Sequence, residues 1–370
     1  MVPTQRLPAS LTPLDTALSA LLRGLEPVQP VALPLADALR CIAAEMPGLP
    51  AQPPHDVAAT DGWALRANDL VGASSYSPLP LAASPAWVEA GDAMPAACDC
   101  VLDADLVEVT GPIAQVLAEA IPGQGVRRKG QDIAEGSFVA EAGRRVVPRN
   151  LMLARAAEIE RLKVRRPRLH VVNIPGATAT TNLVAESARS AGAEVISREA
   201  GARDVGSIVA AFEDAACDLL ITIGGSGVGR TDAAVSALAA RGELIAHGIA
   251  LQPGRTAAVG RLGATPVIVL PGAPDQAFAA WWALALPVLD RLTGRRPRKA
   301  LSLPLSRKIA SLVGIAEFVL LERQRDAWMP LAVGELSLDA IARAQAFLVV
   351  PGGSEGFAAG MAIDAYMLRE

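Results

Sequence analysis

The feature that most constrains the fold is a regular alternation of apolar runs and amphipathic segments between Arg168 and Leu292. The strands are expected at 169–174, 194–197, 219–223 and 267–270, and the helices at 182–191, 208–216, 232–241 and 276–292, the last interrupted near Pro287. Strands that alternate with helices favour a parallel, doubly wound sheet, because each crossover helix returns the chain in the same direction. The sequence therefore predicts an α/β domain in this region.

The strongest local signal within this domain is a glycine-rich loop that follows the strand 219–223. Its residues, Gly224-Gly225-Ser226-Gly227-Val228-Gly229-Arg230-Thr231-Asp232, lead into the next helix, with Asp232 expected in the first helical turn. Glycines allow positive φ angles and close backbone approach, so the loop N–H groups and the helix N-terminus can bind a phosphate. A plain strand-to-helix turn, with Asp232 only complementing the helix dipole, is the alternative interpretation.

The chain on either side of this domain has a different pattern. Residues 1–45 are expected to be helical, with Leu14, Leu18, Leu21 and Leu22 on one apolar face after Thr12-Pro13, and a second short helix at 35–44. Short β-like runs separated by turns follow to about residue 145, at 86–89, 100–102, 107–110, 126–128 and 137–140, and a helix is expected at 150–160. After the basic turn at 294–298, the last 70 residues are again β-like.

Composition narrows the classes of function. The chain of 370 residues is long enough for several domains of roughly 100–200 residues each. Its 34 basic and 38 acidic residues give a net charge of −4, which argues against nucleic acid as the main ligand. Neither a signal peptide nor a membrane span is visible, so we expect a cytoplasmic protein without a membrane partner. The four cysteines form no C-x-x-C pair, so a disulfide scaffold or a cysteine zinc site is not expected.

Three further segments carry side chains of types that serve in catalysis or in anion binding. Asp61-Gly62 lies between two apolar stretches, where it forms either a simple turn or a rigid holder for a carboxylate. The stretch 126–133 places three cations before Asp132, which fits a solvated hairpin tip or an anion site equally well. Two Pro-Gly turns, at 253–254 and 271–272, adjoin strand ends, and Arg255 beside the first is either a surface residue or a clamp for an oxyanion.

These segments occur in an order that resembles the molybdopterin molybdenumtransferase family, the enzymes similar to MoeA and to the E domain of gephyrin. The family signature FDNSAMDGYAVR is similar to residues 55–66, GEDI to 130–133, GGVSVGxxD to 224–232, and PGNP to 271–274. A family aspartate that follows an arginine corresponds to Asp204 in Arg203-Asp204. The resemblance covers essentially the whole chain.

The resemblance implies a four-part fold and a homodimer. It divides the chain into an elongated helical domain (1–50 with 144–167), an inserted β domain (51–143), a molybdopterin-binding α/β domain (168–294) and a C-terminal β-barrel (295–370). The family reaction uses adenylylated molybdopterin, molybdate and a divalent cation, and yields molybdenum cofactor and AMP. A molybdopterin adenylyltransferase or a molybdoenzyme is the protein partner that such a reaction suggests.

The resemblance also assigns roles to individual residues. Asp61 is the residue that corresponds to the family's catalytic aspartate, and Asp232 is expected to act with it. The pterin is expected to bind Gly224, Gly225, Ser226, Gly227, Gly229, Arg255, Pro271 and Gly272. Mg²⁺ is expected to bind Asp61, Asp132, Asp204 and Asp232, because carboxylate oxygens are the ligands it prefers. Arg255 or Arg128 would offset the charge of phosphate and molybdate.

Several positions depart from the family pattern. The GDEL-type loop expected after the first strand of the α/β domain is absent from 173–182. Ala90 stands where the family has a threonine, Gln252 and Arg255 stand for the two lysines of KPGKP, and Ala273 stands for the asparagine of PGNP. Two functions therefore stay open: a molybdenumtransferase-like enzyme, and a non-catalytic molybdopterin-binding or carrier protein. A different nucleotide-handling α/β protein or a pure scaffold is the remaining alternative.

Overall fold

The computed structural model describes residues 5–110, 113–212 and 216–368. Contacts divide the chain into two compact units. Unit 1 comprises Met1–Ala44, Ala142–Val147 and Arg161–Glu370, and unit 2 comprises Glu45–Glu141 and Pro148–Glu160. Every helix within the described residues is too short or too polar to cross a bilayer.

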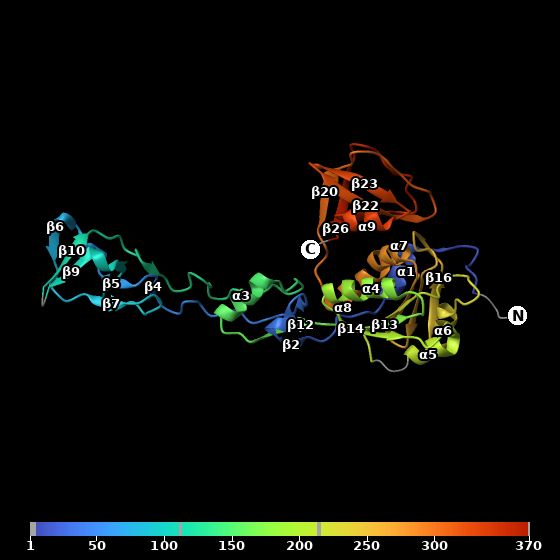
Figure 1. Ribbon diagram of the computed structural model, residues 1–370, viewed down its shortest axis with the longest axis horizontal. Helices are drawn as coiled ribbons and strands as arrows, with labels where there is room; N and C mark the ends of the chain where they lie inside the picture. Colours follow the sequence, from blue (N-terminus) through green and yellow to red (C-terminus); the bar gives the residue numbers. More distant parts are fainter. Residues whose placement is uncertain (1–4, 111–112, 213–215, 369–370) are drawn as a thin grey trace. The chain divides into compact units, whose positions relative to one another are not determined.

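A six-stranded sheet of unit 1 forms the α/β part (Figure 1). Its strands, in spatial order, are β14 (Glu194–Glu199), β13 (Arg168–Asn173), β15 (Leu219–Ile223), β19 (Thr265–Leu270), β18 (Ala258–Leu262) and β16 (Glu243–His247). The first four run parallel, as the sequence predicts, whereas β18 and β16 add an antiparallel edge that it does not predict. The predicted parallel sheet is thus a mixed sheet.

Helices cover both faces of this sheet, which makes it doubly wound (Figure 1). One face packs against α1 (Leu14–Leu22), α4 (Thr178–Ser190), α7 (Pro274–Ala280), the π-helical turn η3 (Trp281–Ala285) and α8 (Leu286–Thr293). The other face packs against α5 (Val205–Phe212) and α6 (Ala234–Arg241). The expected helix 208–216 extends into residues 213–215, which lie outside the described residues. The helix expected at 276–292 runs through the π-helical turn η3, and Pro287 lies in the first turn of α8, directly after this irregularity.

The N-terminal segment differs most from the sequence prediction. Residues 1–45 are not wholly helical: α2 spans only Leu35–Ala38, and β2 (Val31–Pro34) and β3 (Ile42–Ala43) pair with β12 (Arg161–Arg165). Leu21 on α1 is fully buried against the α/β sheet of its own chain, and Leu14, Leu18 and Leu22 pack against the same cluster. Part of this apolar face is therefore covered by the chain itself, while Leu14, Leu18 and Leu22 stay half-buried.

The C-terminal strands form a second, antiparallel-rich sheet in unit 1. Its strands are β1 (Thr12–Pro13), β17 (Ile249–Gln252), β22 (Ala316–Gln324), β23 (Ala327–Val333), β24 (Ala346–Val350), β26 (Ala362–Met367) and β20 (Ala300–Pro304). The sheet curls, because Leu305 beyond β20 forms a bridge with Trp328 on β23. Helix α9 (Leu338–Arg343) and the short two-stranded antiparallel sheet of β21 (Ile309–Ala310) and β25 (Gly356–Phe357) complete this part.

Unit 2 is built of small antiparallel sheets, as the turn spacing predicts. These are β6 (Ser74–Pro80), β10 (Ile113–Ala118) and β9 (Val107–Thr110); β7 (Ala86–Val88), β5 (Gly62–Leu65) and β8 (Cys100–Leu102); and β11 (Val126–Arg127) with β4 (Val57–Ala58). The helical turns are η1 (Ala67–Leu70), η2 (Ala104–Leu106) and α3 (Pro148–Ala156). Residues 137–140, expected as a strand, form no strand.

Candidate functional site

The candidate site lies at the carboxyl ends of the parallel strands of unit 1. Strand β13 has β14 on one side and β15 on the other, so the chain leaves β13 and β15 in opposite directions across the sheet. Such a switch point opens a crevice outside the strand ends, and ligands of open α/β sheets bind there. The glycine-rich loop follows β15, at this point.

A cavity of about 300 Å³ occupies the switch point. Its lining is Gly176, Ala177, Arg203, Gly224, Gly225, Ser226, Gly227, Asp232, Thr256, Pro271, Gly272, Ala273 and Gln276. The structure thus brings together Gly224, Gly225, Ser226, Gly227, Asp232, Pro271 and Gly272, which the sequence had placed in one site. The signal that identified them was positional: each lies just beyond the end of an apolar strand.

The backbone of the glycine-rich loop leaves donors facing outward. Gly224 and Gly225 have φ angles of +92° and +65°, which explains why the loop begins with glycine. The Gly224 N–H donates to the carbonyl of Leu270. The N–H groups of Gly225, Ser226 and Gly227 have no acceptor among the described residues. Three backbone donors at the rim of a cavity are the groups that bind an anion.

The carbonyl groups of the same loop are held by side chains from elsewhere. Nε2 of Gln5 donates to the carbonyl oxygens of Gly225 (3.0 Å) and Gly227 (2.9 Å). His247 at the end of β16 donates from Nε2 to the carbonyl oxygen of Ser226 at 3.0 Å. The loop is therefore fixed from the side opposite to its free N–H groups.

Helix α6 does not offer its N-terminus to a ligand, contrary to the sequence expectation. The Ala234 N–H donates to the carbonyl of Gly225, and the N–H groups of Val235 and Ser236 donate to Oε1 of Gln5. These donors of the first turn are already satisfied. Anion binding at this site therefore depends on the loop and not on the helix.

Asp232 lies before α6 and not in its first turn, because the helix begins at Ala234. Its Oδ2 accepts the Gly229 N–H at 2.8 Å, and its Oδ1 lies 3.1 Å from Nη2 of Arg203. A Cβ atom at Gly227 or Gly229 would lie 2.7 or 2.9 Å from Oδ2 of Asp232. The glycine-rich loop is thus wrapped around this carboxylate, and a side chain at Gly227 would disturb the loop itself before it met a ligand.

Arg203 joins the loops that follow three strands. Its Nη1 donates to the carbonyl of Pro175 after β13, and its Nη2 pairs with Asp232 after β15, while Arg203 itself follows β14.

The neighbouring Asp204 has another role: it accepts the N–H and the hydroxyl of Ser207 in the first turn of α5. These hydrogen bonds lower the pKa of the Asp204 carboxyl.

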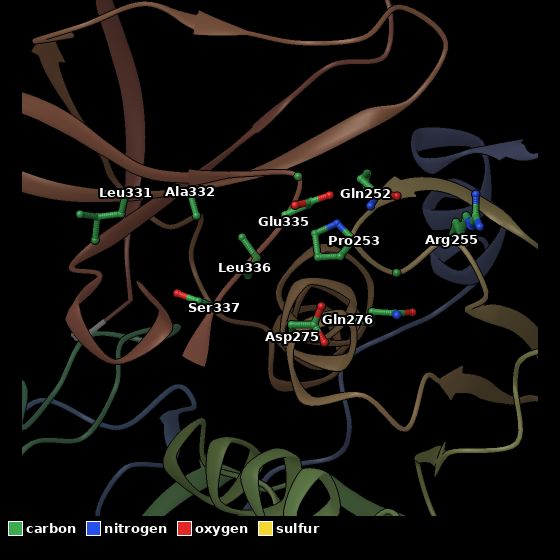
Figure 2. Close-up of a pocket in the computed structure, with 12 residues that line it drawn as sticks. Gln252, Pro253, Arg255, Asp275, Gln276, Leu331, Ala332, Glu335, Leu336 and Ser337 are labelled. Carbon is green, nitrogen blue, oxygen red and sulfur yellow. The ribbon is translucent and has the colours of Figure 1, made fainter. Parts of the chain in front are cut away.

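Arg255 lines a second and larger cavity of about 740 Å³ in the same unit (Figure 2). Gln252, Pro253 and Arg255 after β17 form one part of its wall, Asp275 and Gln276 of α7 another, and residues 331–337 of the C-terminal part a third. Gln276 lines both cavities, so they adjoin at this side chain. Arg255 is the one cation among the described residues that line the larger cavity, against the carboxylates of Asp275 and Glu335.

Asp61 and Asp132 belong to unit 2. Asp61 lies exposed in the bend between β4 and β5, and its Oδ1 accepts the Ala90 N–H at 2.8 Å. Asp132 pairs with Arg127 at 3.1 Å. Asp204 and Asp232 belong to unit 1, so the four expected Mg²⁺ ligands are divided between the units. Among the described residues no three His, Cys, Asp or Glu side chains form a group that could hold a metal ion, and within either unit alone the carboxylates do not fit a Mg²⁺ site.

Two family descriptions and several known proteins match this chain. Residues 12–157 match the family described as "MoeA N-terminal region (domain I and II)", and residues 175–291 match "Probable molybdopterin binding domain". Molybdopterin molybdenumtransferase 2 of Mycobacterium tuberculosis is 30% identical over 286 residues, which cover 65% of this chain and 70% of the relative. The chain belongs to the MoeA-type molybdopterin molybdenumtransferase family.

Other relatives extend this family assignment to nearly the full length. Molybdopterin molybdenumtransferase of Synechococcus elongatus is 26% identical, covering 86% of this chain and 90% of the relative. The crystal structure of a MoeA molybdopterin biosynthesis protein from Pyrococcus horikoshii superimposes with a TM-score of 0.74 at 26% identity, covering 98% of this chain and all of the other. The MoeA-like α/β fold is therefore shown, as the resemblance implied.

Sequence reasoning missed Gln5 and Gln276 as site residues. Gln5 lies more than 200 positions from the loop it contacts, and no local pattern marks a single glutamine as a loop ligand. Gln276 had a signal, because it lies in the first turn of the helix that follows the Pro-Gly turn 271–272 at the strand ends.

Proposed function

We propose that this protein acts in molybdenum cofactor biosynthesis by binding adenylylated molybdopterin and molybdate, inserting molybdenum and releasing AMP. The observation that carries the proposal is the glycine-rich loop at the switch point, with three N–H groups free among the described residues and a cavity in front of them. Family membership supplies the substrate class for a site of this kind.

The chain's own residues can bind the pterin phosphate without a neighbouring cation. The cavity lining carries one arginine and one aspartate, Arg203 and Asp232, and the two are paired. Phosphate is therefore held chiefly by loop N–H dipoles, which need no reorganisation when the charge arrives. Arg203 adds positive charge only if its guanidinium turns from Asp232 towards the phosphate.

Molybdenum insertion and AMP release need further groups besides those that line this cavity. Asp61 remains the proposed catalytic residue, and Mg²⁺ bound by Asp61, Asp132, Asp204 and Asp232 remains a prediction with no step assigned to it. The Arg255 cavity is the larger space beside the pterin site, where one cation faces two carboxylates.

A second candidate function, binding without turnover, has a specific observation in its favour. Asp232 is engaged by Arg203 and by the Gly229 N–H, and the second cavity has Gln252 where the family has a lysine. Such a protein would keep the phosphate loop and carry molybdopterin or the finished cofactor. Both candidates require pterin binding, and only the first requires AMP release.

One experiment separates the two candidates. The purified chain is mixed with adenylylated molybdopterin, Mg²⁺ and molybdate; AMP is measured by chromatography, and pterin binding by fluorescence titration. AMP release above the protein-free rate supports the enzyme, and binding without release supports the carrier. Neither binding nor release would overturn both candidates.

A further inference from the structure

Gln5 is a buried glutamine whose side chain makes four hydrogen bonds to backbone groups. It is 8% exposed, its Nε2 donates to the carbonyl oxygens of Gly225 and Gly227, and its Oε1 accepts from Val235 (2.9 Å) and Ser236 (3.1 Å). One side chain thus connects the glycine-rich loop with the first turn of α6.

Only a carboxamide can make this set of bonds. The two loop carbonyls need a donor, and the two helix N–H groups need an acceptor, at the same position. A carboxylate lacks the donor and an ammonium lacks the acceptor, whereas the Gln amide carries both on one planar group. Asparagine has the same chemistry on a shorter side chain.

The bonds to the carbonyls also decide where the loop N–H groups point. In a planar trans peptide the C=O and the following N–H point in opposite directions. The Gly225 carbonyl shares a peptide with the Ser226 N–H, and the Gly227 carbonyl shares one with the Val228 N–H. When Gln5 holds both carbonyls on its own side, the two N–H groups face away from it. Ser226 and Gly227 line the cavity, whereas Gln5 does not.

We propose that Gln5 is a positioning residue that orients the 225–226 peptide so that the Ser226 N–H faces the bound phosphate of the pterin, and that its bond to the Gly227 carbonyl fixes the next turn of the loop. Its amide oxygen meanwhile occupies the N-terminus of α6, where a phosphate would otherwise bind. The ligand part of this proposal rests on the proposed function, whereas the orienting role does not.

The orienting role is tested without any ligand. Hydrogen exchange of the full chain is compared for wild type, Gln5→Ala, Gln5→Glu and Gln324→Ala, a matched control whose exposed amide donates to Oε2 of Glu322 on β22. We expect the amides of Val235 and Ser236 to exchange about tenfold faster in Gln5→Ala, because they lose their acceptor. In Gln5→Glu the exchange of these two amides should change less, since Oε1 is kept. Unchanged exchange in Gln5→Ala would overturn the proposal.

The ligand part is tested by titrating the same proteins with molybdopterin and, separately, with molybdate. We expect both Gln5 variants to bind molybdopterin about tenfold more weakly than wild type, with molybdate binding unchanged. Gln5→Glu keeps size and an acceptor, so it reports on the donor to the carbonyls even if Gln5→Ala folds poorly. Equal molybdopterin affinity in wild type and Gln5→Glu would overturn this part. A wild type that binds no molybdopterin would instead overturn the proposed function, and the exchange result would still decide the orienting role.

Discussion

Replacing Asp232 should destabilise the glycine-rich loop, and the size of the effect can be worked out from its contacts. The side chain is 15% exposed and accepts the Gly229 N–H. A hydrogen bond to a charged group contributes about 1.5–3 kcal/mol. The ion pair with Arg203, whose side chain is 40% exposed, adds at most about 1 kcal/mol after screening by solvent. Asp232→Ala should therefore lower the free energy of unfolding of unit 1 by about 1.5–4 kcal/mol.

The matched variant Asp232→Asn separates the two contributions. Asparagine can still accept the Gly229 N–H but carries no charge for Arg203, so it should cost only about 1 kcal/mol. A double-mutant cycle with Arg203→Gln should return a coupling of about 1 kcal/mol or less between the two side chains.

The assay is urea unfolding of the full chain followed by tryptophan fluorescence. Trp63 and Trp87 of unit 2 are replaced by phenylalanine in all proteins compared, so that only the tryptophans of unit 1 report. The reasoning would be refuted if Asp232→Ala left the transition midpoint unchanged. It would also be refuted if Asp232→Asn cost as much as Asp232→Ala, since the backbone hydrogen bond would then contribute nothing.

Four further outcomes are expected. Asp61→Asn should abolish AMP release in the reconstituted assay while molybdopterin titrations stay unchanged; retained release would contradict a catalytic role. Gly62→Ala should destabilise unit 2 by about 3 kcal/mol or more in urea unfolding, because a Cβ there would lie 2.2 Å from the carbonyl oxygen of Leu102; a midpoint equal to wild type would show that the strands can separate freely. Since the Ser207 hydrogen bonds lower the pKa of Asp204, its stabilising effect is complete above the unfolded pKa and is lost as pH falls through the folded pKa. Asp204→Ala should therefore lose stability at pH 7 but less at pH 3, and an equal loss at both would exclude this cause. Light scattering at micromolar concentration should give the mass of a homodimer, and a monomer mass would refute it.

The parallel core of the α/β sheet could be predicted because strands that are buried on both faces consist of consecutive apolar residues in the sequence. Strand β15 has the bounds expected from the sequence, and β13 and β19 differ only at their ends. The glycine-rich loop was located for the same reason, since it begins where the run 219–223 stops. The start of α6 was misplaced by two residues, because Asp232 serves the loop rather than the helix.

The strand pairings outside this core could not be predicted. The partners of the antiparallel strands β16 and β18 are set by contacts that no local pattern records. Strand β17, between them in sequence, pairs with β22 in the C-terminal sheet. Leu21 illustrates a different limit: an apolar stripe predicts that a helix face is buried, but not which partner buries it. Gln5 illustrates the same limit for a polar side chain.

The division of the chain into units has a consequence for how the protein is made. Unit 2 and its connections occupy residues 45–160, so its chain is complete before β13 has been synthesised. Helix α1 is made before unit 2, yet the strands that bury Leu21 come from residue 168 onward. During synthesis the apolar face of α1 therefore stays exposed until more than a hundred further residues have been added. Newly made chains are accordingly most exposed to aggregation, and most dependent on chaperones, in the interval before the α/β sheet closes over this helix.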